Sequence, residues 1–214
     1  MTVAAIVDTV AQRLGKAKLS EVEERARRYV LRYFADTARA PSLSELQRKL
    51  QLPSDEDVGV ILSRLHGADL IVYGAARARI VAAYPFSAEP TGHRVEIGNR
   101  TLHALCAIDA LGIPFMLDAP GVIRSGCFWC HAPVGVHVEG GAIAAHWPAD
   151  VVAWYPEKES CGCTATSHCI LINFFCSKDH LAAWRGKNPG EQGTALSLEE
   201  AVEAGRMIFE NLLR

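Results

Sequence analysis

Two residues of the segment HALCAIDALGIPFML could do chemistry together. Cys106 is followed three positions later by Asp109, and most other residues of this segment are apolar or small. We expect a helix over residues 102–112, in which positions three apart lie on one face, so the thiol and the carboxyl would share one pocket. Burial would keep the carboxyl protonated near neutral pH and able to donate a proton. The alternative is a cysteine packed in the core beside a solvent-facing aspartate.

A second thiol of interest comes from a different part of the chain. Cys169 directly precedes the apolar run ILINFF, which we expect to be a buried strand, and it follows the loop SCGCTATSH. Two thiols from separate elements and one carboxyl suit a soft, thiophilic metal, because thiolates prefer such ions over hard ones. The sequence therefore indicates a metal-handling pocket formed by Cys106, Asp109 and Cys169.

Other cysteines could form a second cluster. Of the seven in the chain, Cys127-x-x-Cys130 and Cys161-x-Cys163 could supply four thiolates to a structural zinc site, with free or buried thiols as the alternative. Residues 127–131, CFWCH, also match the attachment motif of c-type haem, which is formed outside the cytosol. The N-terminal residues show helical spacing and no secretory pattern, so we expect a cytoplasmic protein without haem.

Composition and charge argue against nucleic acid and membranes as partners. Hydrophobic residues make up 50% of the chain and charged residues 21%, which is typical of a globular protein. The formal net charge of -2 gives no general attraction to nucleic acid or to an anionic membrane. No apolar run reaches the roughly 20 residues that a membrane-spanning helix requires. We therefore expect neither nucleic acid nor a membrane as a partner.

The first part of the chain has the order helix, turn, helix, hairpin. We expect helices over residues 2–16, 20–38 and 55–66, a short helix that begins at Ser42 or Ser44, and a hairpin with Gly74 near its turn. This order predicts a winged-helix-like module over residues 1–86. The helix that would enter a DNA groove begins with Asp55, Glu56 and Asp57, whose charges would repel phosphate. A packing role is therefore favoured, and a DNA-binding regulator is the alternative.

The second part of the chain, residues 87–214, mixes strands with flanking helices. Its middle, VIRSGCFWCHAPVGVHVEGGAIAAHW, is rich in strand-forming residues, and two helical segments close the chain. Ser197 and Glu200 form a capping-box pattern at the start of the last one. Together the two parts predict an α+β fold, in which a helical module precedes a mainly antiparallel β core flanked by helices.

These segments resemble those of a known family. LHALCAIDALGIP, with its Cys-x-x-Asp, and SHCILINFFCS, with a cysteine five residues before a Phe-Phe pair, are similar to segments of organomercurial (alkylmercury) lyases. RSGCFWCHAPVGVHV, the closing helix and the N-terminal helices extend the resemblance over nearly the full chain. It implies that Cys106, Asp109 and Cys169 are the catalytic residues and that Cys127 is structural.

The resemblance also implies a reaction and its partners. The two thiols would hold the mercury of R-Hg⁺ and Asp109 would move a proton to the departing carbon, which gives R-H and bound Hg²⁺. No organic cofactor is expected; organomercurials would be the substrates, and small thiols or mercuric reductase would accept Hg²⁺ during mercury detoxification. The sequence reads HALCAID where family members usually have an aromatic pair before the cysteine. A lyase-like paralogue that binds soft metal without cleaving carbon-mercury bonds is therefore the alternative.

Overall fold

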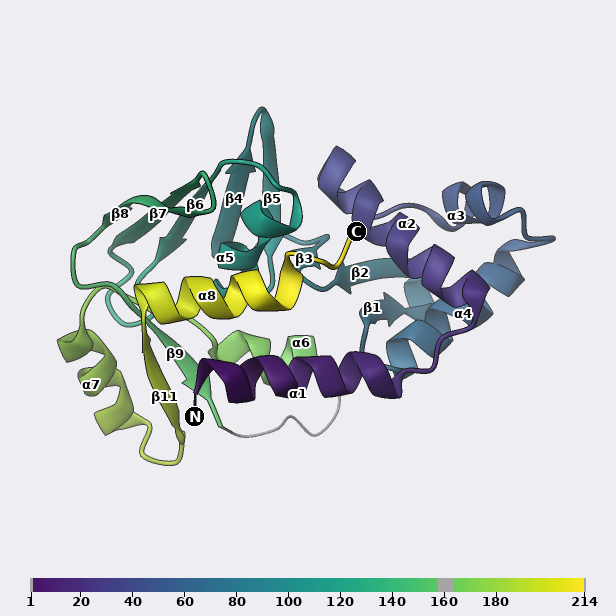
Figure 1. The fold of residues 1–214 in the computed structure, drawn as a ribbon. Coiled ribbons are helices and arrows are strands. Elements are labelled where there is room, and N and C mark those ends of the chain that lie inside the picture. The colour runs from purple at the N-terminus through teal and green to yellow at the C-terminus, as the bar shows by residue number, and fades with distance from the viewer. Residues whose placement is uncertain (1, 158–163, 214) are drawn as a thin grey trace.

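The fold combines helices with antiparallel sheet. The computed structural model describes residues 2–157 and 164–213 of the chain. Every strand pair within these residues is antiparallel, and helices lie before, between and after the strands (Figure 1). The predicted combination of helices with antiparallel sheet is confirmed, and the winged-helix character of the first part stays a prediction.

The helices begin where local capping signals stand. Reciprocal Ser–Glu capping boxes precede α2, α3 and α8. In each box, the serine and glutamate side chains accept hydrogen bonds from backbone N–H groups that have no partner within the helix. The described helices are α1 (Val3–Lys16), α2 (Glu21–Thr37), α3 (Leu43–Leu50), α4 (Asp55–Gly67), α5 (Ala107–Met116), α6 (Thr164–Ser167), α7 (Lys178–Lys187) and α8 (Leu198–Phe209), with two 3₁₀ turns, η1 (Ala75–Arg77) and η2 (Cys169–Leu171).

The strands form a large sheet and a small one. The large sheet has the order β1-β2-β3-β5-β4-β6-β7-β8, and the small sheet has the order β10-β9-β11. Their bounds are β1 (Ile71–Gly74), β2 (Arg79–Ala83), β3 (Phe86–Ser87), β4 (His93–Ile97), β5 (Arg100–Ala104), β6 (Gly121–Gly126), β7 (Pro133–Glu139), β8 (Ala142–Trp147), β9 (Val152–Pro156), β10 (Phe174–Phe175) and β11 (Gly193–Ser197). The proposed division after residue 86 falls within β3, so the large sheet continues across it.

Helices α5 and α8 pack against each other in the centre of the molecule, and α1 runs beside α8 (Figure 1). The contact between α5 and α8 is close because glycines face each other. A Cβ atom on Gly205 would lie 2.9 Å from the backbone nitrogen of Gly112. This packing brings the end of α8 next to the start of α5, where Cys106 and Asp109 lie.

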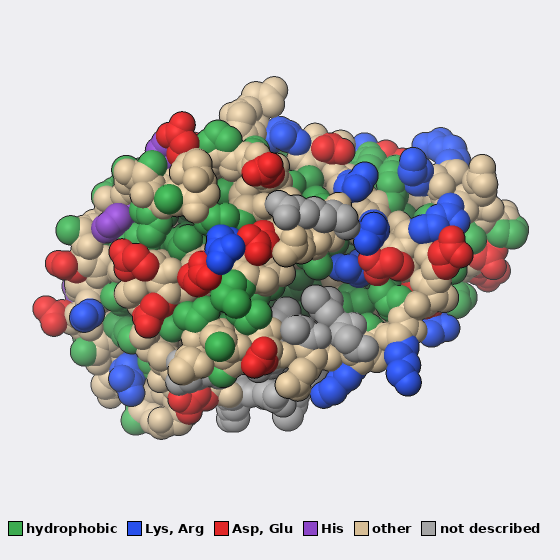
Figure 2. Space-filling model, in the orientation of Figure 1, with side chains coloured by type: hydrophobic (Ala, Val, Ile, Leu, Met, Phe, Trp, Pro, Cys, Tyr) green, Lys and Arg blue, Asp and Glu red, His purple; other side chains and the backbone are tan. Residues whose placement is uncertain are grey.

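Charges of both signs cover the N-terminal helices. On the face in Figure 2, Lys and Arg side chains gather over this part of the molecule, with Asp and Glu side chains among them. Several of these charges are paired, for example Arg28 with Glu24 at 3.0 Å and Arg39 with Glu45 at 2.9 Å. Among the described residues, no helix has both the length and the apolar character needed to cross a membrane.

Candidate functional site

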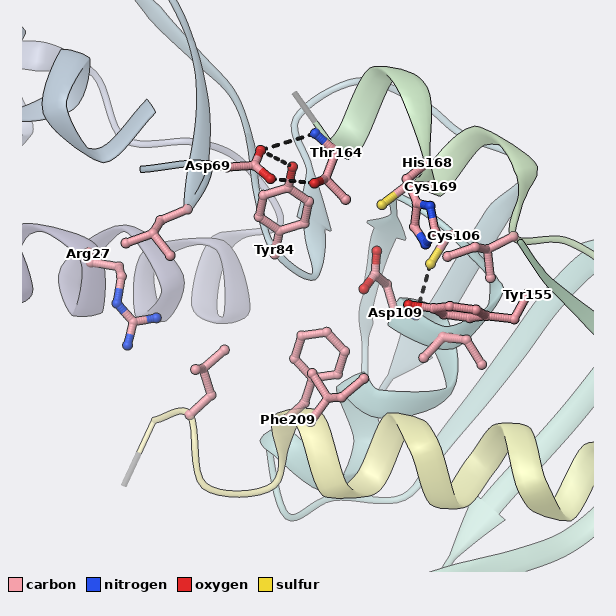
Figure 3. Close-up of a pocket in the computed structure, with 15 residues that line it drawn as sticks. Arg27, Asp69, Tyr84, Cys106, Asp109, Tyr155, Thr164, His168, Cys169 and Phe209 are labelled. Carbon is pink, nitrogen blue, oxygen red and sulfur yellow. Dashed lines mark hydrogen bonds between the residues drawn. The ribbon is translucent and has the colours of Figure 1, made fainter. Parts of the chain in front are cut away.

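A small, mainly apolar cavity lies where the N-terminal module, α5 and the end of α8 meet (Figure 3). Its volume is about 70 Å³. Most of its lining is apolar or aromatic; its sulfur groups come from Cys106 at the start of α5 and Cys169 in η2, and its carboxyl groups come from Asp109 and Asp69. The lining residues are Arg27, Asp69, Leu70, Tyr84, Cys106, Ile108, Asp109, Tyr155, Thr164, His168, Cys169, Ile172, Ile208, Phe209 and Leu212.

Cys106 lies at the beginning of α5 and not inside a helix. The expected helix over residues 102–112 is wrong in its first part, because β5 extends to Ala104 and α5 starts only at Ala107. Cys106 is the N-cap residue in an extended conformation, and its sulfur accepts a hydrogen bond from the backbone N–H of Asp109 at 3.4 Å. The three-residue spacing therefore comes from a capping turn, with sulfur in the position of the usual cap oxygen.

Cys169 is held by a helical turn and not by a strand. The expected strand over ILINFF is reduced to Phe174 and Phe175, and Cys169 begins η2, separated from the end of α6 by one residue. The backbone N–H of Ala107 donates to the carbonyl oxygen of Ile172 at 3.0 Å, which ties this segment to the start of α5. A hydrogen bond between distant segments thus brings the two thiols together.

The three residues proposed from the sequence meet in the cavity. In Figure 3 the sulfurs of Cys106 and Cys169 and the carboxyl group of Asp109 point toward one another. Their ligand atoms all lie within 4.8 Å of one another, and the three side chains are 2%, 4% and 5% exposed in that order. Two sulfurs and one carboxyl oxygen thus converge on a single space, with water largely excluded.

The environment keeps the Cys106 thiol protonated. Burial raises the pKa of Cys106 well above its ordinary value, and the neighbouring Cys169 and Asp109 raise it further, against the lowering effect of the Asp109 backbone N–H. A thiolate at this position therefore requires a cation beside it. A thiophilic metal would supply that cation and displace the proton.

Two further side chains of the cavity are aromatic neighbours of the thiols. His168 and Tyr155 are both buried, and their rings meet edge to face with centroids 5.2 Å apart. In an extended strand, His168 would lie on the face opposite the neighbouring Cys169. His168 and Cys169 both line the cavity, because the segment around these two residues is helical and turns neighbouring side chains by much less than a strand does.

A hydrogen-bonded latch at one end of the cavity was not anticipated from the sequence. Asp69 receives hydrogen bonds from the Tyr84 hydroxyl at 2.9 Å and from the Thr164 backbone N–H at 3.1 Å, and its second oxygen accepts from the Thr164 hydroxyl (Figure 3). The Tyr84 hydroxyl accepts from the backbone N–H of Ala165 at 2.8 Å. The latch joins the first part of the chain to α6, which ends two residues before Cys169. No motif marks these residues in the sequence.

The predicted second thiol cluster is described only in part. Cys161 and Cys163 lie outside the described residues, so this grouping stays a prediction. Cys127 and Cys130 lie on the turn after β6, as the Cys-x-x-Cys spacing suggests, and the side chains beside them are Cys176 and His180. These last two were not selected from the sequence, since Cys176 showed no partner and His180 no metal-binding spacing.

Comparisons with known proteins point to one family. A family model described as alkylmercury lyase matches residues 86–210. The alkylmercury lyases of Bacillus cereus and Streptomyces lividans are each 29% identical to this chain, over 119 and 124 residues. These matches span 56% and 58% of this chain but only 54% and 57% of those proteins, so the chain matches about half the length of these curated relatives. A solved structure, described as the crystal structure of the mercury-bound form of MerB2, superposes with a TM-score of 0.83 at 28% identity and covers 98% of both chains.

Proposed function

The chain belongs to the alkylmercury lyase family, and we propose that it cleaves the carbon-mercury bond of organomercurials by protonolysis. The observation that carries the proposal is the convergence of Cys106, Cys169 and Asp109, three buried side chains whose ligand atoms lie within 4.8 Å of one another. Two thiols can hold mercury between them, and a carboxyl group beside them can move a proton.

In the proposed reaction the two thiols and the carboxyl act in sequence. One thiol binds the mercury of R-Hg⁺ and loses its proton to the solvent. The second thiol gives its proton to Asp109 and binds the same mercury, which weakens the carbon-mercury bond by electron donation. Asp109 then protonates the departing carbon. In balance, R-Hg⁺ and two thiols give R-H, mercury bound by Cys106 and Cys169, and one proton.

The apolar surroundings support this role. Leu70, Ile108 and Phe209 line the cavity beside the three reactive groups and offer the organic group of the substrate an apolar wall. Exclusion of water strengthens the interaction between the thiolates and mercury and keeps the proton on Asp109 until carbon receives it. The small cavity favours small organic groups at the carbon.

The proposal is tested by measuring hydrocarbon release. The full chain is incubated with methylmercury or phenylmercury and excess small thiol, and methane or benzene is measured by headspace gas analysis. We expect turnover with the parent and its loss with Cys106→Ser, Cys169→Ser and Asp109→Asn. Cys130→Ser is the matched control, since Cys130 is an exposed cysteine outside the cavity, and it should retain turnover.

Mercury binding is measured in the same samples. A parent that binds mercury but releases no hydrocarbon would refute the lyase proposal and support the alternative of a soft-metal-binding paralogue. Asp109→Asn has a sharper expectation, because the two thiols remain: it should bind mercury at the parent stoichiometry and release little hydrocarbon.

We also propose the cellular setting that the family implies. The protein would act in the cytoplasm, with no organic cofactor, and pass Hg²⁺ to small thiols or to mercuric reductase. Residues 1–86 would form a winged-helix-like packing module and residues 87–214 the catalytic domain. Arg27, Asp69 and Leu70 of the first part line the cavity, which supports a role in closing the site in preference to DNA binding.

A further inference from the structure

A second group of metal-binding side chains lies outside the cavity. It consists of Cys127, Cys130, Cys176 and His180, whose ligand atoms all lie within 4.8 Å of one another. The sulfurs of Cys130 and Cys176 are 3.7 Å apart. The Nδ1 atom of His180 lies 3.7 Å from the Cys127 sulfur and 2.9 Å from the Cys176 sulfur. None of the four residues lines the cavity.

Backbone hydrogen bonds build this group from two distant segments. The turn after β6 is closed by the N–H of Cys127, which donates to the carbonyl of Ala132 at 2.8 Å, and by the N–H of His131, which donates to the carbonyl of Cys127 at 2.8 Å. The N–H of Phe128 donates to the carbonyl of Phe174 in β10 at 2.8 Å. The turn is thereby fixed beside β10, and the chain leaving β10 carries Cys176.

The start of α7 supplies the fourth side chain. Ser177 is the N-cap of α7 and accepts a hydrogen bond from the backbone N–H of His180, which fixes the first helical turn. Because His180 stands four residues after Cys176, the turn directs its ring back to the sulfurs. The spacing Cys-x-x-Cys is typical of metal-binding turns.

We propose that these three thiols and one imidazole form a tetrahedral Zn²⁺ site, which is independent of the lyase chemistry. Three cysteines and one histidine are a common donor set of structural zinc sites. With zinc-sulfur bonds of about 2.3 Å, a tetrahedral site places two sulfurs about 3.8 Å apart. The 3.7 Å between Cys130 and Cys176 already matches this separation. The contact between Cys176 and His180 is shorter, at 2.9 Å, and would open by about half an ångström.

The electrostatics of the group also favour a cation. Burial raises the pKa of Cys127, but backbone N–H groups at Cys130, Cys176 and Trp129 and the His180 ring outweigh it and bring the pKa to about 6. For Cys176, burial and the two neighbouring sulfurs raise the pKa to about 12. Three thiolates this close together would repel one another, and a divalent cation between them would remove this repulsion.

The site would clamp the turn after β6 to β10 and α7. Cys130 is exposed and Cys176 and His180 are half-buried, so a metal ion could enter from the surface, whereas Cys127 is 1% exposed and forms the inner end of the group. Because the assembled donor set exists only in the folded chain, bound zinc would raise the temperature of unfolding.

Cobalt and zinc titrations of the metal-free full chain test the proposal. In a phosphine reductant, we expect one Co²⁺ per chain with the visible absorption of tetrahedral cobalt thiolate, and its displacement by one equivalent of Zn²⁺. Cys130→Ser and His180→Ala should weaken cobalt binding by at least the roughly 10- to 100-fold that follows the loss of a partner supporting a metal ligand. Both side chains are at or near the surface, and circular dichroism checks that each variant is folded.

Two paired variants are the matched controls. Cys106→Ser with Cys169→Ser removes the thiols of the cavity, and Cys161→Ser with Cys163→Ser removes the thiols of the other predicted grouping. Both should bind cobalt as the parent does. The proposal is overturned if the parent gives no tetrahedral cobalt spectrum after full reduction, if either control pair abolishes it, or if Cys130→Ser and His180→Ala bind like the parent.

Discussion

The close contact between α5 and α8 predicts a large effect of a single methyl group. A Cβ atom on Gly205 would lie 2.9 Å from both the backbone nitrogen of Gly112 and the carbonyl oxygen of Ile108. Ordinary contacts of a Cβ atom begin near 3.4 Å. Because both neighbours are backbone atoms of α5, they cannot rotate away, and Gly205→Ala must push the two helices apart by about half an ångström.

The loss of unfolding free energy in Gly205→Ala is the difference between two opposing effects. Overpacking a core typically costs about 1–3 kcal/mol, and the contact with rigid backbone puts Gly205→Ala at the upper end of that range. Alanine in place of glycine inside a helix recovers up to about 1 kcal/mol. The net loss is therefore about 2 kcal/mol, which lowers the melting temperature of a chain of this size by about 4–8 °C.

Gly59→Ala is the matched control for the stability gained when alanine replaces glycine inside a helix. Gly59 lies inside α4, and a Cβ atom there would find only the Tyr73 hydroxyl, at an ordinary 3.6 Å. This variant should melt about 2–4 °C above the parent. Thermal unfolding of the parent and both variants, followed by circular dichroism, checks the difference. If Gly205→Ala melts at or above the parent while Gly59→Ala behaves as expected, the close packing of α5 on α8 is refuted.

The same contact reaches the proposed active site. A Cβ atom on Gly112 would lie 2.3 Å from the ring of Phe209, which lines the cavity. Gly112→Ala should therefore displace this ring, change the shape of the cavity wall and reduce phenylmercury turnover more than methylmercury turnover. An equal loss for both substrates would argue against a steric effect on the organic group.

Three further predictions concern polar groups that are buried or half-buried. Tyr84→Phe removes the hydroxyl that accepts a hydrogen bond from the Ala165 N–H, so it should lower the free energy of unfolding by about 1–2 kcal/mol. It should also speed labelling of the cavity thiols by a disulfide reagent, and unchanged labelling would contradict the role of these hydrogen bonds as a latch. Burial lowers the pKa of His93 to about 4, so the unfolded chain takes up the proton at a higher pH than the folded chain. The free energy of unfolding should therefore fall by about 3 kcal/mol between pH 6.5 and 4. Urea titrations should show a flatter pH profile for His93→Gln, and an equal slope would exclude this role. Hydrogen bonds from the backbone and hydroxyl of Ser20 hold the pKa of Glu23 below 4.5 despite burial. Glu23→Ala should therefore cost about 1–3 kcal/mol of stability at pH 7, and this difference from the parent should shrink as the pH falls below 4.5. A difference that is constant with pH would contradict this reasoning.

Local signals made the helices of the first part predictable. The expected helices over residues 20–38 and 55–66 correspond to Glu21–Thr37 and Asp55–Gly67. Their starts are marked by serine side chains within one turn of the residues they cap, so a short window of sequence contains the whole signal. Cys106 and Asp109 were selected in the same way, from residue type and short spacing, whereas Cys169 was selected because it precedes an apolar run.

The positions of those residues in the fold could not be predicted as well. Cys106 lies at a junction between strand and helix, and the apolar residues around it fit a buried helix equally well. The backbone N–H of Phe128 donates to the carbonyl of Phe174, 46 residues later in the chain. This hydrogen bond joins the segment of Cys127 and Cys130 to the segment of Cys176 and His180. No rule of sequence spacing encodes a contact that depends on where two strands meet, so this pairing of thiols was visible only in the fold.

The two groups of thiols differ in what their surroundings permit. Cys106 is buried among apolar side chains beside Asp109 and stays protonated, so a metal that binds there displaces a proton next to a carboxyl group that can receive it. Cys127 is buried too, but backbone N–H groups surround its sulfur and stabilise the thiolate before any metal arrives. A thiol that gives up its proton only on binding suits protonation of a departing carbon, whereas a thiolate that is already formed suits permanent retention of an ion. The same side chain thus fits a reactive role in one place and a structural role in the other, because the backbone around it differs.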